Sequence, residues 1–227
     1  MPVAKVLRTV LDTCGPGCAL IAALLPNLLV AETLTVAVVD STGAPVPEVV
    51  IYAGRGASGP TVPQSEMTAV MDQVDRRFVP HILVVQTGTA VDFPNSDDIA
   101  HHVYSFSHPN HFKLPMYKGR AHPPVTFTES GIVVLGCNIH DNMLGYIVVV
   151  DTPTFGVTDD AGTVVLSAPG IEAGNVEIWS PRIRDDLTRL VAEVRSSNQG
   201  TVATFRLAKP LYPAYDGQSE ALSWSEY

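Results

Sequence analysis

The sequence predicts an all-β protein built from two β-sandwiches. Short runs of β-branched and aromatic residues recur along the chain, separated by Gly, Pro, Asn and Asp, as strands and turns are. No run between Val70 and Asp151 keeps a helical period over three turns. The chain has 18 Pro and 17 Gly among 227 residues and is 46% hydrophobic and 16% charged, which suits a loop-rich globular protein.

The first 31 residues differ from the rest. Lys5 and Arg8 precede an apolar run from Cys18 to Ala31, which ends in small residues. This pattern is typical of a secretory signal, with cleavage after Ala31, and predicts a periplasmic protein. The run is shorter than a comfortable membrane span, and an uncleaved N-terminal anchor is the alternative.

The predicted strands follow in order. Residues 33–55 hold two alternating runs around the turn Ser41-Thr42-Gly43, and residues 54–67 form a Gly/Ser/Pro-rich linker. Within 68–152, the runs HILVVQ, TAVDF, HHVYSF, PVTFT, GIVVLGC and LGYIVVVD predict the strands of one sandwich.

Residues 153–209 resemble residues 33–55 in their pattern of short strand-forming runs and turn residues. TDDAGTVVL, NVEIWS and TVATFRLA predict strands, and we expect LTRLVAEVR to be a strand, with a short helix as the alternative. Neither end segment has enough strands to bury a sheet alone, so we predict one discontinuous sandwich, 33–55 plus 153–209, into which 68–152 is inserted. A single enlarged sandwich with edge extensions is the alternative. The polar tail, 210–227, is expected to be mobile.

Charge and cysteine content restrict the function. The net charge is −9, and loss of residues 1–31 would leave it near −10, which disfavours nucleic acid and anionic membranes as partners. Cys14 and Cys18 lie in the predicted signal, so Cys137 would be the one cysteine of the mature chain. A lone cysteine in an oxidising compartment cannot form an internal disulfide, which favours a buried or metal-bound thiol.

One short loop carries the strongest chemical signal. Cys137, His140 and Met143 have the spacing C-x2-H-x2-M and directly follow the apolar run Ile132 to Leu135. Thiolate, imidazole and thioether form a soft donor set that suits copper, whereas calcium and magnesium prefer oxygen and zinc gains little from a thioether. The loop predicts a copper site.

A second histidine would complete a trigonal Cys-His-His set with a weak axial Met. His101 and His102 are neighbours in the predicted strand HHVYSF, and adjacent residues of a strand face opposite sides. Only one of the two can therefore enter a buried site.

The remaining histidines carry weaker predictions. His108 and His111 are expected on a solvated loop, a second exposed metal site being the alternative. For His81 and His122 the sequence indicates no partner. Met116 is expected to pack under the metal site.

The patterns V-x-F-x-N-x-D, H-x-V and C-x2-H-x2-M together resemble the cupredoxins, and the short ligand loop is most similar to that of the amicyanins. The resemblance implies a Greek-key β-sandwich and one type 1 (blue) copper ion, held by His101, Cys137, His140 and the axial Met143. It favours His101 over His102. Cupredoxins often carry an asparagine where this chain has His102, and because of this departure from the family pattern His102 stays the alternative.

Nearly the whole chain after residue 31 resembles the bacterial cupredoxin-like proteins labelled methylamine utilisation proteins, which are predicted periplasmic copper proteins. The segments DQVDRRFVPHILVVQTG, KLPMYKG and VVLGCNIHDNMLGYIVVVDTP carry this resemblance. The end segments resemble transthyretin-like, carboxypeptidase-regulatory-like sandwiches. The label does not imply that this protein handles methylamine.

These features predict a one-electron carrier and not an enzyme, since the sequence offers no open coordination position and no base beside the metal ligands. The partner would be a redox protein, such as a cytochrome c or a dehydrogenase. A periplasmic copper carrier or chaperone is one alternative, and a non-redox β-sandwich binding module is another.

Overall fold

The structure, a computed structural model, describes residues 32–54, 68–108, 110–120, 122–140, 142–168, 171–185, 190, 192–197 and 200–215. Within these ranges every regular element is a β-strand except one 3-10 turn, η2 (Ala173–Asn175). The predicted all-β class is therefore confirmed. The predicted signal, 1–31, lies outside the described residues, as does nearly all of the linker. Among the residues described, no helix is long and apolar enough to cross a membrane.

Two sheets are built from the two ends of the chain, and we call them the outer sandwich. The four-stranded sheet has the order β14-β1-β17-β16 and the three-stranded sheet the order β13-β2-β15. The strands are β1 (Glu32–Val39), β2 (Val50–Ala53), β13 (Phe155–Val157), β14 (Thr163–Ala168), β15 (Val176–Trp179), β16 (Ala192–Ser197) and β17 (Gly200–Arg206). Alternating residues of β1 are buried, so Leu34, Val36 and Val38 line the core between these two sheets.

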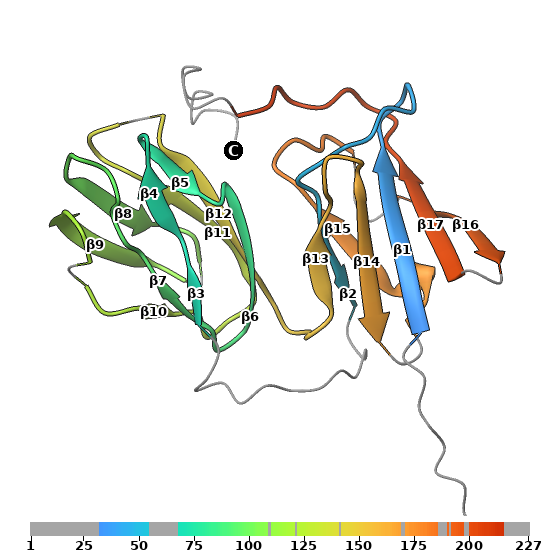
Figure 1. Cartoon of the computed structure of the whole chain (residues 1–227), viewed down its shortest axis with the longest axis horizontal. Coiled ribbons are helices and arrows are strands. Elements are labelled where there is room, and N and C mark those ends of the chain that lie inside the picture. The colour runs from blue at the N-terminus through green and yellow to red at the C-terminus, as the bar shows by residue number, and fades with distance from the viewer. Residues whose placement is uncertain are drawn as a thin grey trace, which may run out of the picture.

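The segment between them forms the inner sandwich. Its five-stranded sheet has the order β6-β12-β11-β8-β9 and faces the three-stranded sheet β10-β7-β3, with the hairpin β4-β5 beside them (Figure 1). The strands are β3 (Thr68–Val70), β4 (Asp72–Val74), β5 (Arg77–Val79), β6 (Ile82–Gln86), β7 (Ala90–Asp92), β8 (His101–Ser105), β9 (Phe112–Tyr117), β10 (Val125–Thr126), β11 (Gly131–Gly136) and β12 (Leu144–Val150).

The two sandwiches lie side by side and share an apolar layer. Tyr146, Val148 and Val150 of β12 pack in one cluster with Val50 of β2 and, at its edge, Trp179 of β15. The alternate β12 residues belong to the core of the inner sandwich instead. This double burial explains why β12 is apolar at nearly every position, since a strand covered on both faces has no solvent-facing side.

Strand β1 joins the first part of the chain to the last. It pairs antiparallel with β14 and parallel with β17, so a strand from the first part of the chain shares one sheet with strands from its last part. This pairing is the arrangement that a discontinuous sandwich requires. Residues 192–197 form a strand and not a helix, as expected for this part of LTRLVAEVR.

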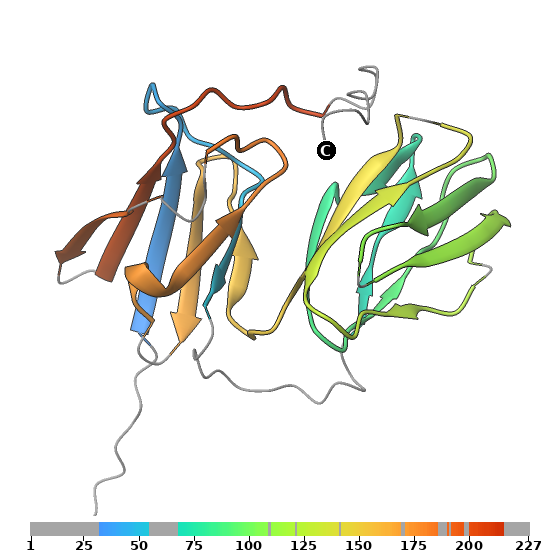
Figure 2. The same cartoon turned by 180° about the vertical axis from the view of Figure 1, so that it is seen from behind.

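After β17 the chain turns back toward the inner sandwich. Both views show this segment crossing at the end of the molecule where the β11–β12 loop lies (Figure 2). We expected a mobile tail from residue 210. Residues 210–215 make specific contacts, including a hydrogen bond from the N–H of Tyr212 to the carbonyl of Arg182 at 2.9 Å, and the rest of the predicted tail lies outside the described residues. The aromatic side chains of this segment have partners on both sandwiches, Arg184 for Tyr212 and His81 for Tyr215.

Candidate metal centre

The predicted ligand loop is the connection between two central strands of the inner sandwich. β11 and β12 pair antiparallel in a register that sets Gly136 opposite Leu144, which leaves residues 137–143 as the loop. Cys137 directly follows β11 and Met143 directly precedes β12, so the sheet holds both ends of the loop. The side chains of Cys137 and Met143 are 3% and 1% exposed and belong to the same core cluster.

Strand β8 brings the first histidine to this loop. Its burial alternates, so that His101, Val103 and Ser105 face the core and His102 is half-buried on the opposite face. The His101 side chain is fully buried, and its Nδ1 lies 3.8 Å from Cys137 Sγ. Strand alternation therefore places His101, and not His102, beside the cysteine.

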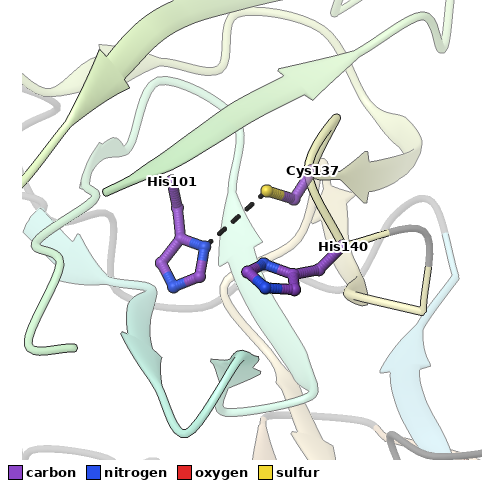
Figure 3. Close-up of side chains that lie close together, drawn as sticks. All are labelled: His101, Cys137 and His140. Carbon is purple, nitrogen blue, oxygen red and sulfur yellow. Dashed lines mark hydrogen bonds between the residues drawn. The ribbon is translucent and has the colours of Figure 1, made fainter. Parts of the chain in front are cut away.

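The structure brings three of the four predicted ligands into one cluster. One side-chain donor atom from each of His101, Cys137 and His140 lies within 4.8 Å of the others, and Figure 3 shows the three side chains converging from β8 and from the loop. The two imidazole rings have centroids 5.1 Å apart, inclined at 61°. The fourth, Met143, is tied to the cluster through its backbone, because its N–H donates to the His140 carbonyl at 2.9 Å.

One unsatisfied polar atom in this cluster fits a metal ion. His140 Nδ1 is buried and has no hydrogen-bond partner in the described part of the chain. Cys137 forms no disulfide with any described residue. A buried polar atom without a partner costs about 1–3 kcal/mol, and a coordinated ion would remove that cost. The donor set of one thiolate and two imidazoles beside a thioether suits copper.

Asp97 orients the buried histidine. Its Oδ2 lies 2.6 Å from His101 Nε2, on the side of the ring away from Cys137. An ionised carboxylate can only accept, so His101 Nε2 carries the proton and, in the neutral ring, Nδ1 keeps the lone pair that faces the cysteine. A carboxylate behind a metal-binding histidine fixes its tautomer and raises its basicity as a ligand.

The turn between β4 and β5 holds this carboxylate in its charged form. Asp75 and Arg76, both with positive φ, point their N–H groups at Asp97, and the N···O distances are 2.6 and 2.9 Å. Burial alone would raise the pKa of Asp97, but these hydrogen bonds and the one from His101 outweigh it and lower the pKa.

His140 differs from His101 in its access to solvent. It lies on the loop and is only half-buried, next to Ile139, whose side chain is 44% exposed. Burial lowers the pKa of His140, as do electrostatic interactions with His101 and Arg76, whereas the interaction with Asp97 raises it. The neutral ring, which is the form that binds a metal, is therefore favoured.

The other sequence predictions have different outcomes. Met116 was expected to pack under the site, but its side chain is 51% exposed because it points outward from β9. His108 and His111 belong to no cluster of three metal-binding side chains among the described residues. His81, for which the sequence indicated no partner, stacks on Tyr215 with centroids 4.5 Å apart.

Sequence reasoning also missed the role of Asp97. Asp97 is the last residue of the V-x-F-x-N-x-D pattern and lies four residues before His101, but neither signal shows which side chain turns toward the histidine.

No protein-family profile and no curated protein matches the chain. Among solved structures, similar ones include a copper-containing nitrite reductase from Thermus scotoductus SA-01 (23% identity, TM-score 0.36), a mutant of amicyanin in the oxidized state (26%, 0.34) and a purple cupredoxin from Nitrosopumilus maritimus (19%, 0.32). The alignments cover 51%, 41% and 37% of this chain and 28%, 98% and 100% of those chains. The chain thus spans 28% of the reductase. At these TM-scores the likeness carries no argument, and the site stands on its own geometry.

Proposed function

We propose that this protein binds one copper ion at His101, Cys137, His140 and Met143, and works as a one-electron carrier of the cupredoxin type. The observation that carries the proposal is the buried cluster of two imidazoles and a thiol, with donor atoms within 4.8 Å of one another. Bound there, copper would supply a one-electron couple between Cu(I) and Cu(II).

Contacts within the chain support three of the four proposed ligands. Asp97 holds the His101 ring in one tautomer, β11 fixes Cys137, and the N–H of Met143 is bonded within the loop. We expect ligands supported in this way to move little between oxidation states. That property favours electron transfer over a copper carrier, which must release its ion.

The half-buried His140 ring is the ligand through which electrons would enter and leave. His101, Cys137 and Met143 are all at most 3% exposed, so a partner protein could approach no other ligand. The partner would be a redox protein such as a cytochrome c or a dehydrogenase, and the acidic charge of −9 would suit a basic docking face.

The periplasm is the proposed location. The supporting observation is the sequence of residues 1–31, with its basic start, apolar run and small residues at the end. Cys137 without a described disulfide partner suits that oxidising compartment only if the thiol is buried or bound, and it is buried.

Repeated oxidation and reduction of the copper-loaded protein tests the proposed role. An electron carrier should keep one copper per chain through many cycles, as measured by metal analysis after gel filtration in each state. Loss of the ion on reduction would contradict electron transfer and favour a copper carrier. His140→Gly loaded with copper should exchange electrons with a small redox protein more slowly than the wild type, whereas His102→Gly should not.

A further inference from the structure

The chain after β17 is anchored to the outer sandwich before it reaches the inner one. Leu207 is fully buried, and its N–H donates to the Val39 carbonyl at 2.9 Å. The carboxylate of Asp185 then accepts from the N–H groups of the next two residues, at 3.2 Å each. We call residues 207–215 the C-terminal strap.

The middle of the strap is held at Tyr212. Its backbone exchanges two hydrogen bonds with Arg182, of 2.9 Å from the Tyr212 N–H and 3.2 Å from Arg182 Nε. The guanidinium of Arg184 lies 4.8 Å from the centroid of the Tyr212 ring. These contacts fix the path of the strap, so that its last described residue reaches the inner sandwich in a defined position.

That last residue, Tyr215, contacts the ligand loop. Its hydroxyl donates to the Asn142 carbonyl and accepts from the N–H of Leu144 at 3.1 Å. Its ring stacks on His81 with an interplanar angle of 10°, and the His81 ring meets Tyr146 edge-on, with centroids 5.5 Å apart. The hydroxyl uses both its donor and its acceptor capacity on this one loop.

Met143 lies between the two backbone groups that Tyr215 binds. Asn142 precedes it and Leu144 follows it, so one hydroxyl holds the backbone on both sides of the methionine. The N–H of Met143 is also bonded, to the His140 carbonyl. The Met143 side chain is 1% exposed, and its position therefore depends on how this short stretch of backbone is held.

We propose that Tyr215 is a positioning residue for Met143, through which the outer sandwich sets the place of the thioether in the ligand loop. The proposal deepens the proposed function and rests on it for its redox consequence, since a weak axial methionine tunes the reduction potential of a copper site. The placement of Met143 itself does not require copper and can be tested without it.

The decisive variant is Tyr215→Phe, which keeps the ring on His81 and removes both hydrogen bonds. In the metal-free protein, amide hydrogen exchange at Leu144 should become roughly five- to tenfold faster, as loss of one hydrogen bond implies. The methyl resonance of Met143 should move. In the copper-loaded protein, the reduction potential and the relative intensities of the visible bands should shift in the same variant.

Tyr212→Phe is the matched control, because it removes a hydroxyl from the same strap. The Tyr212 hydroxyl has no hydrogen-bond partner in the portion of the chain described. This variant should leave the Leu144 exchange rate, the Met143 resonance and the potential at their wild-type values. A chain ended after Pro213 removes the Tyr215 ring as well and should shift the Met143 resonance at least as far as Tyr215→Phe.

The metal-free measurements separate this proposal from the proposed function. A wild type that binds no copper refutes the copper carrier, yet a shifted Met143 resonance in Tyr215→Phe would still support the positioning role. Identical Leu144 exchange and Met143 resonances in the wild type and Tyr215→Phe overturn the proposal, whether or not copper binds.

Discussion

At the scale of single residues, the site depends on which nitrogen of His101 carries the proton. Asp97 accepts three hydrogen bonds, from the backbone N–H groups of Asp75 and Arg76 and from His101 Nε2. The two backbone donors keep the carboxylate in place and charged, so the imidazole presents Nδ1 to the cysteine in the metal-free protein. Asp97 would thus act on the proposed metal site without being one of its ligands.

Replacing this carboxylate should weaken copper binding. In Asp97→Asn the neutral amide is a poorer acceptor for His101 Nε2–H, and the ring loses the charge that raises its basicity. Loss of such a partner typically lowers metal affinity about 10–100-fold. A competition titration of Cu(II) against a chelator measures this affinity. The reduction potential should also rise, because the substitution destabilises bound Cu(II) more than bound Cu(I).

Asp98→Asn is the control for that experiment. Asp98 is the neighbouring carboxylate, and only its backbone carbonyl takes part in a hydrogen bond, with Lys118 Nζ, among the interactions of the described residues. The copper affinity of Asp98→Asn should equal that of the wild type. Equal losses in the two variants would show that general negative charge matters, and not the contact with His101.

At the scale of elements, the ligand loop is held by how its two strands pack. Gly136 ends β11 beneath Tyr104 of β8, with which it is paired across the sheet. A Cβ at position 136 would lie 2.8 Å from atoms of the Tyr104 ring, closer than real contacts allow. The missing side chain is what permits the ring to cover the strand just before Cys137.

Gly136→Ala should therefore destabilise the fold by about 1–3 kcal/mol, the usual cost of overpacking a core. Urea unfolding of the metal-free protein measures this free energy. Gly174→Ala is the control, because a Cβ there meets nothing within 4 Å, and it should be close to neutral. A Gly136→Ala protein as stable as the control would contradict the packing argument.

How well the sequence predicts these elements depends on how far apart the interacting residues lie along the chain. Cys137, His140 and Met143 are within seven residues, so their spacing alone indicated one loop, and the alternation of β8 left two choices for the histidine. The roles of Asp97 and His81 could not be predicted in the same way. The first depends on a turn more than 20 residues away, and the second on Tyr215, far along the chain.

At the scale of the whole molecule, the sheet β13-β2-β15 of the outer sandwich and the five-stranded sheet of the inner sandwich share an apolar layer. The run LGYIVVVD predicted a strand at β12, but the sequence did not show that β2, β13 and β15 cover its outer face. His81 lies beside this junction, between Tyr146 and Tyr215. Burial lowers its pKa from the ordinary value of 6.5, against smaller opposing effects of Glu48 and the Leu144 backbone.

The free energy of unfolding of the metal-free protein should accordingly fall as the pH drops below 6.5. The folded-state pKa values of His81 and His140 are both lowered, so between those values and 6.5 the unfolded chain binds more protons than the folded one. Acid then favours unfolding, and this part of the stability is fully present only above the unfolded pKa.

Urea unfolding at about pH 7.5 and about pH 5.5 measures the loss. His81→Phe keeps an aromatic ring against Tyr215 but cannot take up a proton. It should lose less stability between the two pH values than the wild type, with His140 accounting for part of the remainder. Equal losses in the two proteins would show that His81 is not the group responsible.

The visible absorption spectrum of the protein with one equivalent of Cu(II), compared with that of Cys137→Ser, tests the central claim most directly. We predict an intense thiolate-to-copper band that reductant bleaches, that returns on reoxidation and that is absent from Cys137→Ser. No such band in the wild type, or copper held equally well by Cys137→Ser, would contradict a blue-copper site at His101, Cys137, His140 and Met143.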